Sequence, residues 1–227
     1  MGEQYALVLG SSQGLGFEIT TYLLDEGYIV FGASRTETPI NHINFIDIAT
    51  DVKYEQSVEE MFEIISETTD KLDLIINSAG ICQMGPIEEV SSNEFTEHFA
   101  TNTLGAFHIL KHLKDFLIEN KTHIIHLLSE VINKGTPNLS AYTSSKHGLK
   151  GLIECCKKEW EELGIRFSNL LPGAINTSLW DNVGMDISRE NMLQIDDFIH
   201  VLDMVIKSPN HLQFPEMSIT HRNSKTD

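Results

Sequence analysis

The chain has 227 residues, of which 41% are hydrophobic, which suits one α/β domain with a large core and leaves little room for two. Its formal net charge of −17 argues against nucleic acid or an anionic membrane surface as the main partner, because both reward basic patches. The three cysteines, Cys82, Cys155 and Cys156, match neither a disulfide framework nor a zinc site, so we expect reduced thiols and no metal. No apolar run approaches the roughly 20 residues of a membrane span, and the start MGEQYALVLG lacks the basic segment of a secretion signal. These features predict a cytoplasmic protein.

Apolar runs and amphipathic segments alternate along the chain. The first run, YALVL at 5–9, predicts a buried strand, and residues 15–27 after it predict a helix. Further strands are predicted at 28–33, 43–47, 72–77, 122–128, 165–171 and 216–220. Further helices are predicted at 57–69, within 91–119 as one or two segments, at 140–164 and at 195–208.

Two helix starts carry capping signals. Ser57 with Glu60 three residues later has the pattern of a capping box, and Ser91 or Ser92 is the expected cap of the next helix. Strands that alternate with helices predict an α/β fold with a doubly wound parallel sheet of the Rossmann type. We expect one domain over residues 1–221 and a loose tail at 222–227.

A glycine-rich turn, LGSSQGLGFEI, connects the first predicted strand to the first predicted helix. Glycine is needed where the chain turns sharply, where the backbone approaches a pyrophosphate and where the helix packs on the sheet. The free N–H groups at the start of the helix then face the phosphate. The turn therefore predicts a dinucleotide site at Gly10, Ser12, Gly14, Leu15 and Gly16.

The end of the second predicted strand bears on the choice of cofactor. An NAD site usually has an acidic residue there, whereas this chain has Ser34 followed by Arg35. A neutral residue leaves room for a 2′-phosphate, which a guanidinium binds with paired hydrogen bonds, so we expect NADP(H) in preference to NAD(H). The alternative is a surface arginine paired with Glu37, and Gln13 adds no second basic residue to the turn.

Several further segments fit one pattern. Tyr142 and Lys146 stand one helical turn apart in SAYTSSKHG, Ser129 ends a strand thirteen residues earlier, and Asn102 lies within a predicted helix. NSAG at 77–80 ends the fourth strand and LPGAINT at 171–177 ends the sixth. In this order and spacing, together with the glycine-rich turn, they resemble the short-chain dehydrogenase/reductase family over nearly the whole chain.

The resemblance implies a role for each matching residue. Tyr142 would donate or accept the proton, and Lys146 would bind the nicotinamide ribose and lower the pKa of the tyrosine. Ser129 would hold the substrate oxygen, and Asn102 would anchor a water that relays protons. The remaining implied cofactor contacts are Asn77, Ala79 and Gly80 along the cleft, Asp47 and Ile48 at the adenine, and Pro172, Gly173, Ile175 and Thr177 around the nicotinamide.

The chemistry agrees with these roles. Tyrosine has a pKa near 10, and bringing it close to 7 takes roughly 4 kcal/mol of differential stabilisation. A lysine one turn away and an oxidised, cationic nicotinamide both favour the phenolate. In the reductive direction the same tyrosine donates its proton as hydride reaches the carbonyl carbon.

The sequence departs from the family pattern in two places. Only SRTETPINH joins the second and third strands, so the helix that family members have there is predicted to be missing. The segment 178–194 before the last helix is short, which predicts a shallow lid with Leu179, Trp180 and Met185 as candidate apolar contacts.

The substrate is not specified by these patterns. We expect its pocket walls to come from 130–139 and from the lid, with Glu130 either facing a polar substrate or facing solvent. Cys82 follows NSAG and either lines the pocket or is a thiol without a role.

The expected activity is hydride transfer between NADP(H) and a ketone, an aldehyde or a secondary alcohol. The alternatives are an NAD-linked alcohol dehydrogenase, a nucleotide sensor without catalysis, and a reductase of thioesters on an acidic carrier protein, which the net charge disfavours. The family forms dimers and tetramers through its long helices, so a homo-oligomer built on 101–119 and 140–163 is expected.

Overall fold

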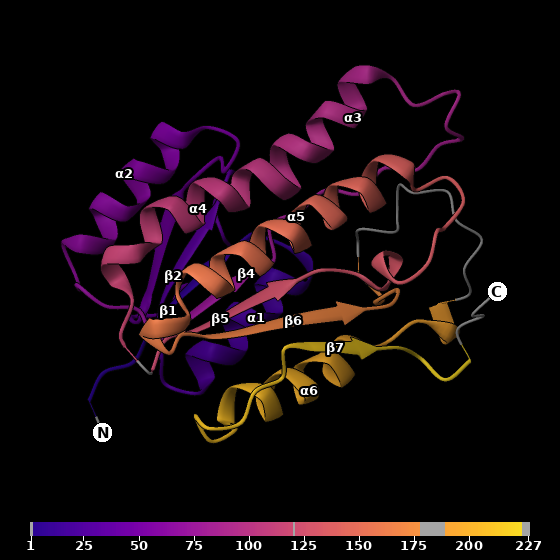
Figure 1. The fold of residues 1–227 in the computed structure, drawn as a ribbon. Coiled ribbons are helices and arrows are strands. Elements are labelled where there is room, and N and C mark those ends of the chain that lie inside the picture. Colours follow the sequence, from indigo (N-terminus) through magenta and orange to yellow (C-terminus); the bar gives the residue numbers. More distant parts are fainter. Residues whose placement is uncertain (1, 120, 178–188, 224–227) are drawn as a thin grey trace.

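The computed structural model describes residues 2–119, 121–177 and 189–223. One sheet of seven parallel strands runs through the molecule (Figure 1). Its strands are β1 (Tyr5–Leu9), β2 (Ile29–Ser34), β3 (Phe45–Ala49), β4 (Leu74–Asn77), β5 (His123–Leu127), β6 (Arg166–Pro172) and β7 (Glu216–Ile219). Their order is β3-β2-β1-β4-β5-β6-β7, so the winding direction reverses between β1 and β4. A crevice for a ligand forms at such a point, outside the carboxyl ends of the strands.

Helices cover both faces of this sheet. They are α1 (Gly14–Asp25), α2 (Glu55–Ser66), α3 (Ser92–Phe99), α4 (Gly105–Leu113), α5 (Ser140–Glu159) and α6 (Ile195–Lys207). Figure 1 shows α2, α4 and α5 on one face and α6 on the other, where α1 packs against α6. The doubly wound α/β prediction is confirmed.

The strand β1 (YALVL) is buried along its whole length because both faces of the sheet are covered there. In β1, Leu7 and Leu9 join the core under α2, α4 and α5, whereas Ala6 and Val8 join the core under α1 and α6. The alternation of side chains along a strand thus feeds two separate hydrophobic clusters. Their packing holds the carboxyl ends of the strands in fixed positions.

The predicted start of α2 was wrong. The helix begins at Glu55, and its N-cap residue, Tyr54, makes no side-chain cap within the described residues. Ser57 already lies in the first turn, where its Oγ accepts a hydrogen bond from the N–H of Asp51 at 3.0 Å. The hydroxyl therefore closes the loop before the helix, and the expected capping box of Ser57 and Glu60 does not form between these two described residues.

The expected helical region 91–119 holds two α-helices joined by a π-helical turn. Ser91 and Glu94 form a capping box at the start of α3, so Ser91, one of the two predicted cap residues, is the N-cap. The chain then passes through the π-helical turn, Ala100–Leu104, into α4 without leaving the helical course. Turns of this kind occur often at functional sites, and this one contains Asn102.

The long helix predicted at 140–164 ends earlier than expected. α5 stops at Glu159, a short 3₁₀ turn follows, and Gly164 closes the segment with a left-handed φ of 63°. The buried Trp160 packs against Phe167 at 5.9 Å between ring centroids, which directs the chain toward β6. None of the described helices, α5 included, is long and apolar enough to cross a bilayer.

The connection between β2 and β3, residues 35–44, is all described and contains no helix, as the short segment SRTETPINH at 34–42 predicted. Hydroxyl groups hold it to the glycine-rich turn instead. Thr36 donates to the Oγ of Ser12 at 3.0 Å, and the hydroxyls of Ser11 and Thr38 lie 3.0 Å apart. The short connection is therefore ordered by the same turn that is expected to bind phosphate.

Candidate active site

The glycine-rich turn leads from β1 into α1 and packs tightly on the segment after β4. Gly10 has a φ of 81°, and a Cβ there would lie 3.0 Å from the backbone of Ala79. A Cβ on Gly16 would lie 2.0 Å from the carbonyl oxygen of Gly10, so a side chain is excluded there. Gly14, with a φ of 55°, opens α1 and has no atom within 4 Å of an added Cβ among the described residues. The turn thus presents backbone and the start of a helix, which suits an anionic pyrophosphate.

The end of β2 places polar groups beside this turn. The buried Ser34 donates to the carbonyl oxygen of Thr36 at 2.6 Å, while Arg35 is exposed. Arg35 and Glu37 are both described and form no ion pair, so the alternative interpretation of Arg35 lacks its partner. Arg35 directly precedes Thr36 in the chain, and the hydroxyl of Thr36 donates to Ser12.

β3 ends two residues later than the sequence indicated, at Ala49 in place of Asp47. Asp47 therefore lies in the middle of the strand, where it pairs in register with Gly32 and accepts a hydrogen bond from the N–H of Thr38 at 3.1 Å. Asp51 lies two residues beyond the end of β3, where its Oδ1 accepts a hydrogen bond from the N–H of Lys53 at 3.1 Å. Contact of Asp47 or Ile48 with adenine stays a prediction.

Tyr142 and Lys146 lie on the first turns of α5 and face the cleft after β5. The Nζ of Lys146 donates to the carbonyl oxygen of Leu127 at 2.8 Å and lies 5.7 Å from the centre of the Tyr142 ring. Burial lowers the pKa of Lys146 to about 8, while the nearby Cys82 thiol acts in the opposite direction. Near neutral pH the lysine is therefore still mostly charged.

The pKa of Tyr142 is raised, first by burial and then by the Cys82 thiol, whereas its hydrogen bond with Ser129 lowers it. Lys146 was expected to lower the pKa of this tyrosine, but in the protein alone burial has the larger effect and raises it. A protonated phenol is the form that can donate a proton to a carbonyl oxygen. Ser129 stands two residues beyond the end of β5 and opens a 3₁₀ turn, which turns its hydroxyl toward Tyr142.

Asn102 connects the π-helical turn to the segment after β4. Its Oδ1 accepts from the N–H of Ile81 at 2.8 Å, and its Nδ2 donates to the carbonyl oxygen of Ile81 at 3.0 Å. The same Nδ2 lies 2.9 Å from the Oγ of Ser145, on the turn of α5 between Tyr142 and Lys146. Asn102 thus ties α5 to the cleft wall, and its role toward a water stays a prediction.

Gly80 lies where these groups converge. A Cβ there would lie 3.3 Å from Asn102 Oδ1 and 3.5 Å from Lys146 Nζ. Asn77, the last residue of β4, is buried, and its side-chain amide lies 3.4 Å from His126 Nδ1. Ala79 and Gly80 therefore border the cleft directly, whereas the side chain of Asn77 contacts a neighbouring strand.

The expected nicotinamide pocket follows β6. Gly173 donates its N–H to the carbonyl oxygen of Ile219 at 2.8 Å, and the buried Ile175 forms a bridge with Leu193. Pro172 ends the strand and Thr177 is half-buried at the limit of the described segment. The lid candidates Leu179, Trp180 and Met185 lie outside the described residues.

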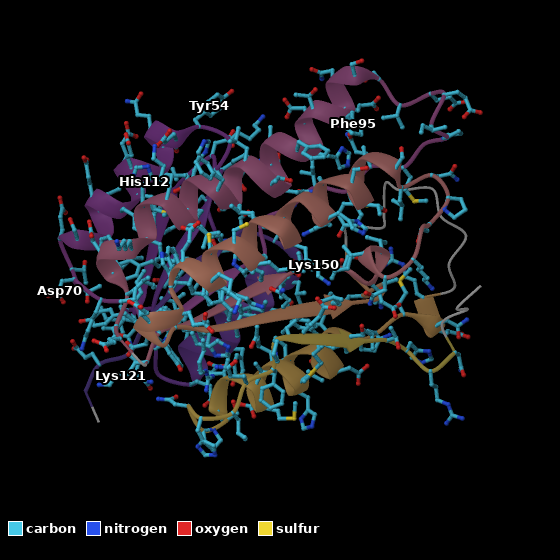
Figure 2. The ribbon with its side chains drawn as sticks, in the orientation of Figure 1. Tyr54, Asp70, Phe95, His112, Lys121 and Lys150 are labelled. Atoms are coloured by element: carbon cyan, nitrogen blue, oxygen red, sulfur yellow. The ribbon has the colours of Figure 1, made fainter. Side chains whose placement is uncertain are left out.

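A separate group of possible metal ligands lies on the outer face of α2 and α4. Atoms of Glu55, Glu59 and His112 lie within 4.8 Å of one another, which the sequence analysis did not foresee. Glu55 is already paired with Lys111 and with His112, and its pKa is lowered to about 2 by these hydrogen bonds. The group is explained by these ion pairs and lies apart from the cleft; Figure 2 shows His112 on the α2 side of the molecule.

Comparison with known proteins decides the family. The family model for short chain dehydrogenases matches residues 4–188, the span that contains the glycine-rich turn, Asn102, Ser129, Tyr142 and Lys146. The chain belongs to the short-chain dehydrogenase family. It is thus an NAD(P)-dependent dehydrogenase or reductase, as the residue patterns indicated.

Relatives and solved structures agree with this assignment. The chain is 32% identical over 183 residues to an NADPH-dependent pterin aldehyde reductase of Arabidopsis thaliana, covering 76% of this chain and 75% of that protein. Relatives differ in length, and the chain spans from 65% of one to 96% of another.

Two solved structures share the fold at low sequence identity. An alcohol dehydrogenase of the archaeon Thermococcus sibiricus complexed with 5-hydroxy-NADP has a TM-score of 0.87 at 22% identity and full coverage of both chains, 100% each. A 3-ketoacyl-(acyl-carrier-protein) reductase of Brucella melitensis complexed with NADH has a TM-score of 0.87 at 21% identity, with 98% of each chain covered.

Proposed function

We propose that this short-chain dehydrogenase uses NADP(H) to reduce a ketone or an aldehyde to an alcohol, or runs the reverse reaction. The observation that carries the proposal is the gathering of Tyr142, Lys146 and Ser129 at one edge of the sheet, beside the glycine-rich turn. A proton donor, a cation and a hydroxyl then surround one position where a carbonyl oxygen can bind. A nucleotide sensor could use Lys146 to bind the cofactor, but it would need neither a proton donor nor a hydroxyl for a substrate oxygen.

The residues present fit a dinucleotide. The backbone of Gly14 is open on the side where a Cβ would point, and α1 starts there with no acidic residue in its first turn, all of which is described. When bound, the nicotinamide supplies or accepts the hydride. The protein supplies the rest: Tyr142 transfers the proton to the substrate oxygen, and Ser129 donates a hydrogen bond to the same oxygen as negative charge develops on it. The buried charge of Lys146 favours that negative charge.

The preference for NADP(H) rests on Arg35 and its neighbours. Arg35 is exposed, and the next residue, Thr36, donates its hydroxyl hydrogen to the Oγ of Ser12 in the glycine-rich turn. A guanidinium with two hydroxyl donors is a suitable set for a 2′-phosphate, since charge-assisted hydrogen bonds to phosphate are strong. The Arabidopsis relative is an NADPH-dependent reductase, which supports the same preference.

The test of the cofactor preference is a side-by-side titration of the protein and its Arg35→Ala variant with NADPH and NADH. We expect the variant to bind NADPH about tenfold more weakly and NADH unchanged, since one charge-assisted contact contributes about 1.5 kcal/mol. Equal loss for both cofactors would mean that Arg35 acts on the loop and not on the phosphate. Tighter binding of NADH by the natural protein would support the NAD-linked alternative.

A heterocyclic aldehyde is the first substrate class to screen, by analogy with the Arabidopsis reductase. The assay follows NADPH absorbance with aldehydes and ketones, and NADP⁺ reduction with secondary alcohols. Binding of the cofactor without turnover of any of them would favour the sensing alternative.

We also propose a homo-oligomer formed through α4 and α5, in the cytoplasm. Phe95, Leu104 and Phe107 are each between 41% and 43% exposed on the helical course α3–α4, a concentration of apolar surface that a partner copy would cover. Figure 2 labels Phe95 on α3. All three cysteines are free, which fits a reducing compartment. Light scattering at micromolar concentration tests the oligomer.

A further inference from the structure

The segment after β4 is held to the helix beside it by two side chains. His98 and Asn102 stand four residues apart, on α3 and on the π-helical turn that extends it. Asn102 binds both backbone groups of Ile81, as described above, and His98 Nε2 accepts a hydrogen bond from the N–H of Gln83 at 3.1 Å. The residue between these two held positions is Cys82.

The ring of His98 is fixed in one tautomer. Its Nδ1 lies 2.7 Å from the carbonyl oxygen of Glu94, and a carbonyl oxygen can only accept, so Nδ1 carries the hydrogen. Its Nε2 faces the N–H of Gln83 and must be the acceptor. With 1% of its surface exposed, His98 has both ring nitrogens committed to the backbone of two different segments.

His98 also contacts the catalytic tyrosine. The ring centroids of His98 and Tyr142 lie 6.5 Å apart at an angle of 71°, which is the edge-to-face arrangement that aromatic pairs favour. The Cys82 thiol, on the segment that His98 holds, is close enough to Tyr142 and Lys146 to affect the titration of both. One histidine therefore touches the tyrosine and holds the chain on which Cys82 stands.

We propose that His98 is a positioning residue, which fixes the segment 81–85 against Tyr142 and thereby sets the substrate-side wall of the cleft at Cys82. The proposal rests on the oxidoreductase function proposed above. Loss of the His98 imidazole would widen the cleft beside Tyr142. It would leave the glycine-rich turn, on the far side of Ala79, unaffected. We therefore expect the KM for a carbonyl substrate to rise more than kcat falls in His98→Ala, with NADPH affinity unchanged.

The first measurement needs no substrate. The exposed Cys155 reacts with iodoacetamide as an internal reference, whereas Cys82 and Cys156 are 8% and 9% exposed and serve as a matched buried pair. In His98→Ala we expect the alkylation of Cys82 to accelerate about fivefold, because one buried hydrogen bond is lost, and that of Cys156 to stay as it is. Mass spectrometry of the peptides measures the three rates separately.

Two variants sharpen the result. His98→Gln keeps a side-chain oxygen that can accept from Gln83, so Cys82 should react at the natural rate and KM should be restored. His108→Ala is the matched control: His108 is buried on α4 and its Nδ1 lies 2.9 Å from the carbonyl oxygen of Val52, away from Tyr142. In this variant the Cys82 rate and the substrate KM should not change.

Three outcomes would overturn the proposal: Cys82 unchanged in His98→Ala, equal acceleration of Cys82 and Cys156, or His98→Gln behaving like His98→Ala. If no carbonyl substrate is found but Cys82 accelerates as expected, the proposed function fails and the positioning role stands. If the natural protein turns over a carbonyl and Cys82 does not respond, only the positioning role fails.

Discussion

Two buried histidines on β5 show how differently the ends of the sheet are built. At the amino end, His123 accepts a hydrogen bond from the Nη2 of Arg166 at 2.6 Å and lies 2.9 Å from the Oγ of Ser168. At the carboxyl end, His126 has one weak contact, with Asn77 at 3.4 Å, and its Nε2 has no partner among the described residues. Both rings are buried between the same strands.

Arg166 extends the satisfied network at the amino end to the end of α6. Its guanidinium also donates to the carbonyl oxygens of Val205, Ser208 and Pro209, so it caps the helix and joins it to β5 and β6. Such a fully bonded network stabilises one packing arrangement of the sheet and the helix.

The carboxyl end leaves polar capacity unused. Asn77, His126 and Asn169 pair in register across β4, β5 and β6, and an oxygen of each asparagine is unpartnered within the described residues. The row lies under α5, and Lys146 of this helix donates a hydrogen bond to the nearby carbonyl oxygen of Leu127. The comparison shows that buried polar side chains at the carboxyl end of the sheet, where the candidate site lies, lack some hydrogen-bond partners among the described residues. Those at the amino end are bonded and stabilise the fold.

Tyr142→Phe should have the largest effect, and on activity alone. Removing the proton donor is expected to lower kcat/KM by about a thousandfold, roughly 4 kcal/mol, with the free energy of unfolding nearly unchanged. Steady-state kinetics on a good carbonyl substrate and urea unfolding measure the two quantities. Near-normal turnover of this variant would refute the role of the tyrosine and the proposed reaction.

Arg166→Ala should affect stability and not chemistry. It leaves His123 Nδ1 and the last carbonyls of α6 without their donor, so we expect a loss of about 3 kcal/mol in the free energy of unfolding. The folded fraction should keep its kcat. Lys150→Ala is the control, since Lys150 (labelled in Figure 2) is a half-exposed cation. It pairs with Glu216 at 2.6 Å, and its removal should cost less than about 1 kcal/mol. Similar losses in both variants would contradict the comparison.

The buried histidines His123 and His126 should make the free energy of unfolding depend on pH. Burial lowers the pKa of His123 and of His126 to about 3, against about 6.5 in an unfolded chain. Between these values the unfolded chain binds protons that the folded chain does not, so stability is lost as the pH falls below about 6.5.

His126→Phe removes one of these two groups while keeping an aromatic ring against Phe167. The slope of the unfolding free energy between pH 5.5 and 4.5 should then flatten by about 1.4 kcal/mol per pH unit. Urea unfolding across that range measures it, and His147→Gln, on the exposed face of α5, is the matched control. An unchanged slope would show that His126 is already solvated in the folded protein.

Much of the site could be predicted from local sequence. The glycine-rich turn, the Tyr142–Lys146 pair and the missing helix after Ser34 each depend on neighbours within a few residues, so spacing sufficed. The late end of β3 and the early start of α2 were missed because Asp47 and Ser57 make hydrogen bonds that local rules do not include. The contacts of His98 with Gln83 and of Arg166 with α6 depend on how distant segments meet, which no spacing records.

The π-helical turn at Ala100–Leu104 gives the helical course α3–α4 an angular offset between its two halves. Each residue of a helix turns the direction of the side chain by about 100°. Deletion of a single residue in this turn would restore a regular helix, but it would rotate His98 away from the segment after β4 if α4 kept its place. The positions of the cleft wall and of α4 thus both depend on the number of residues in the π-helical turn. Single-residue insertions and deletions in this stretch should therefore be selected against more strongly than most substitutions.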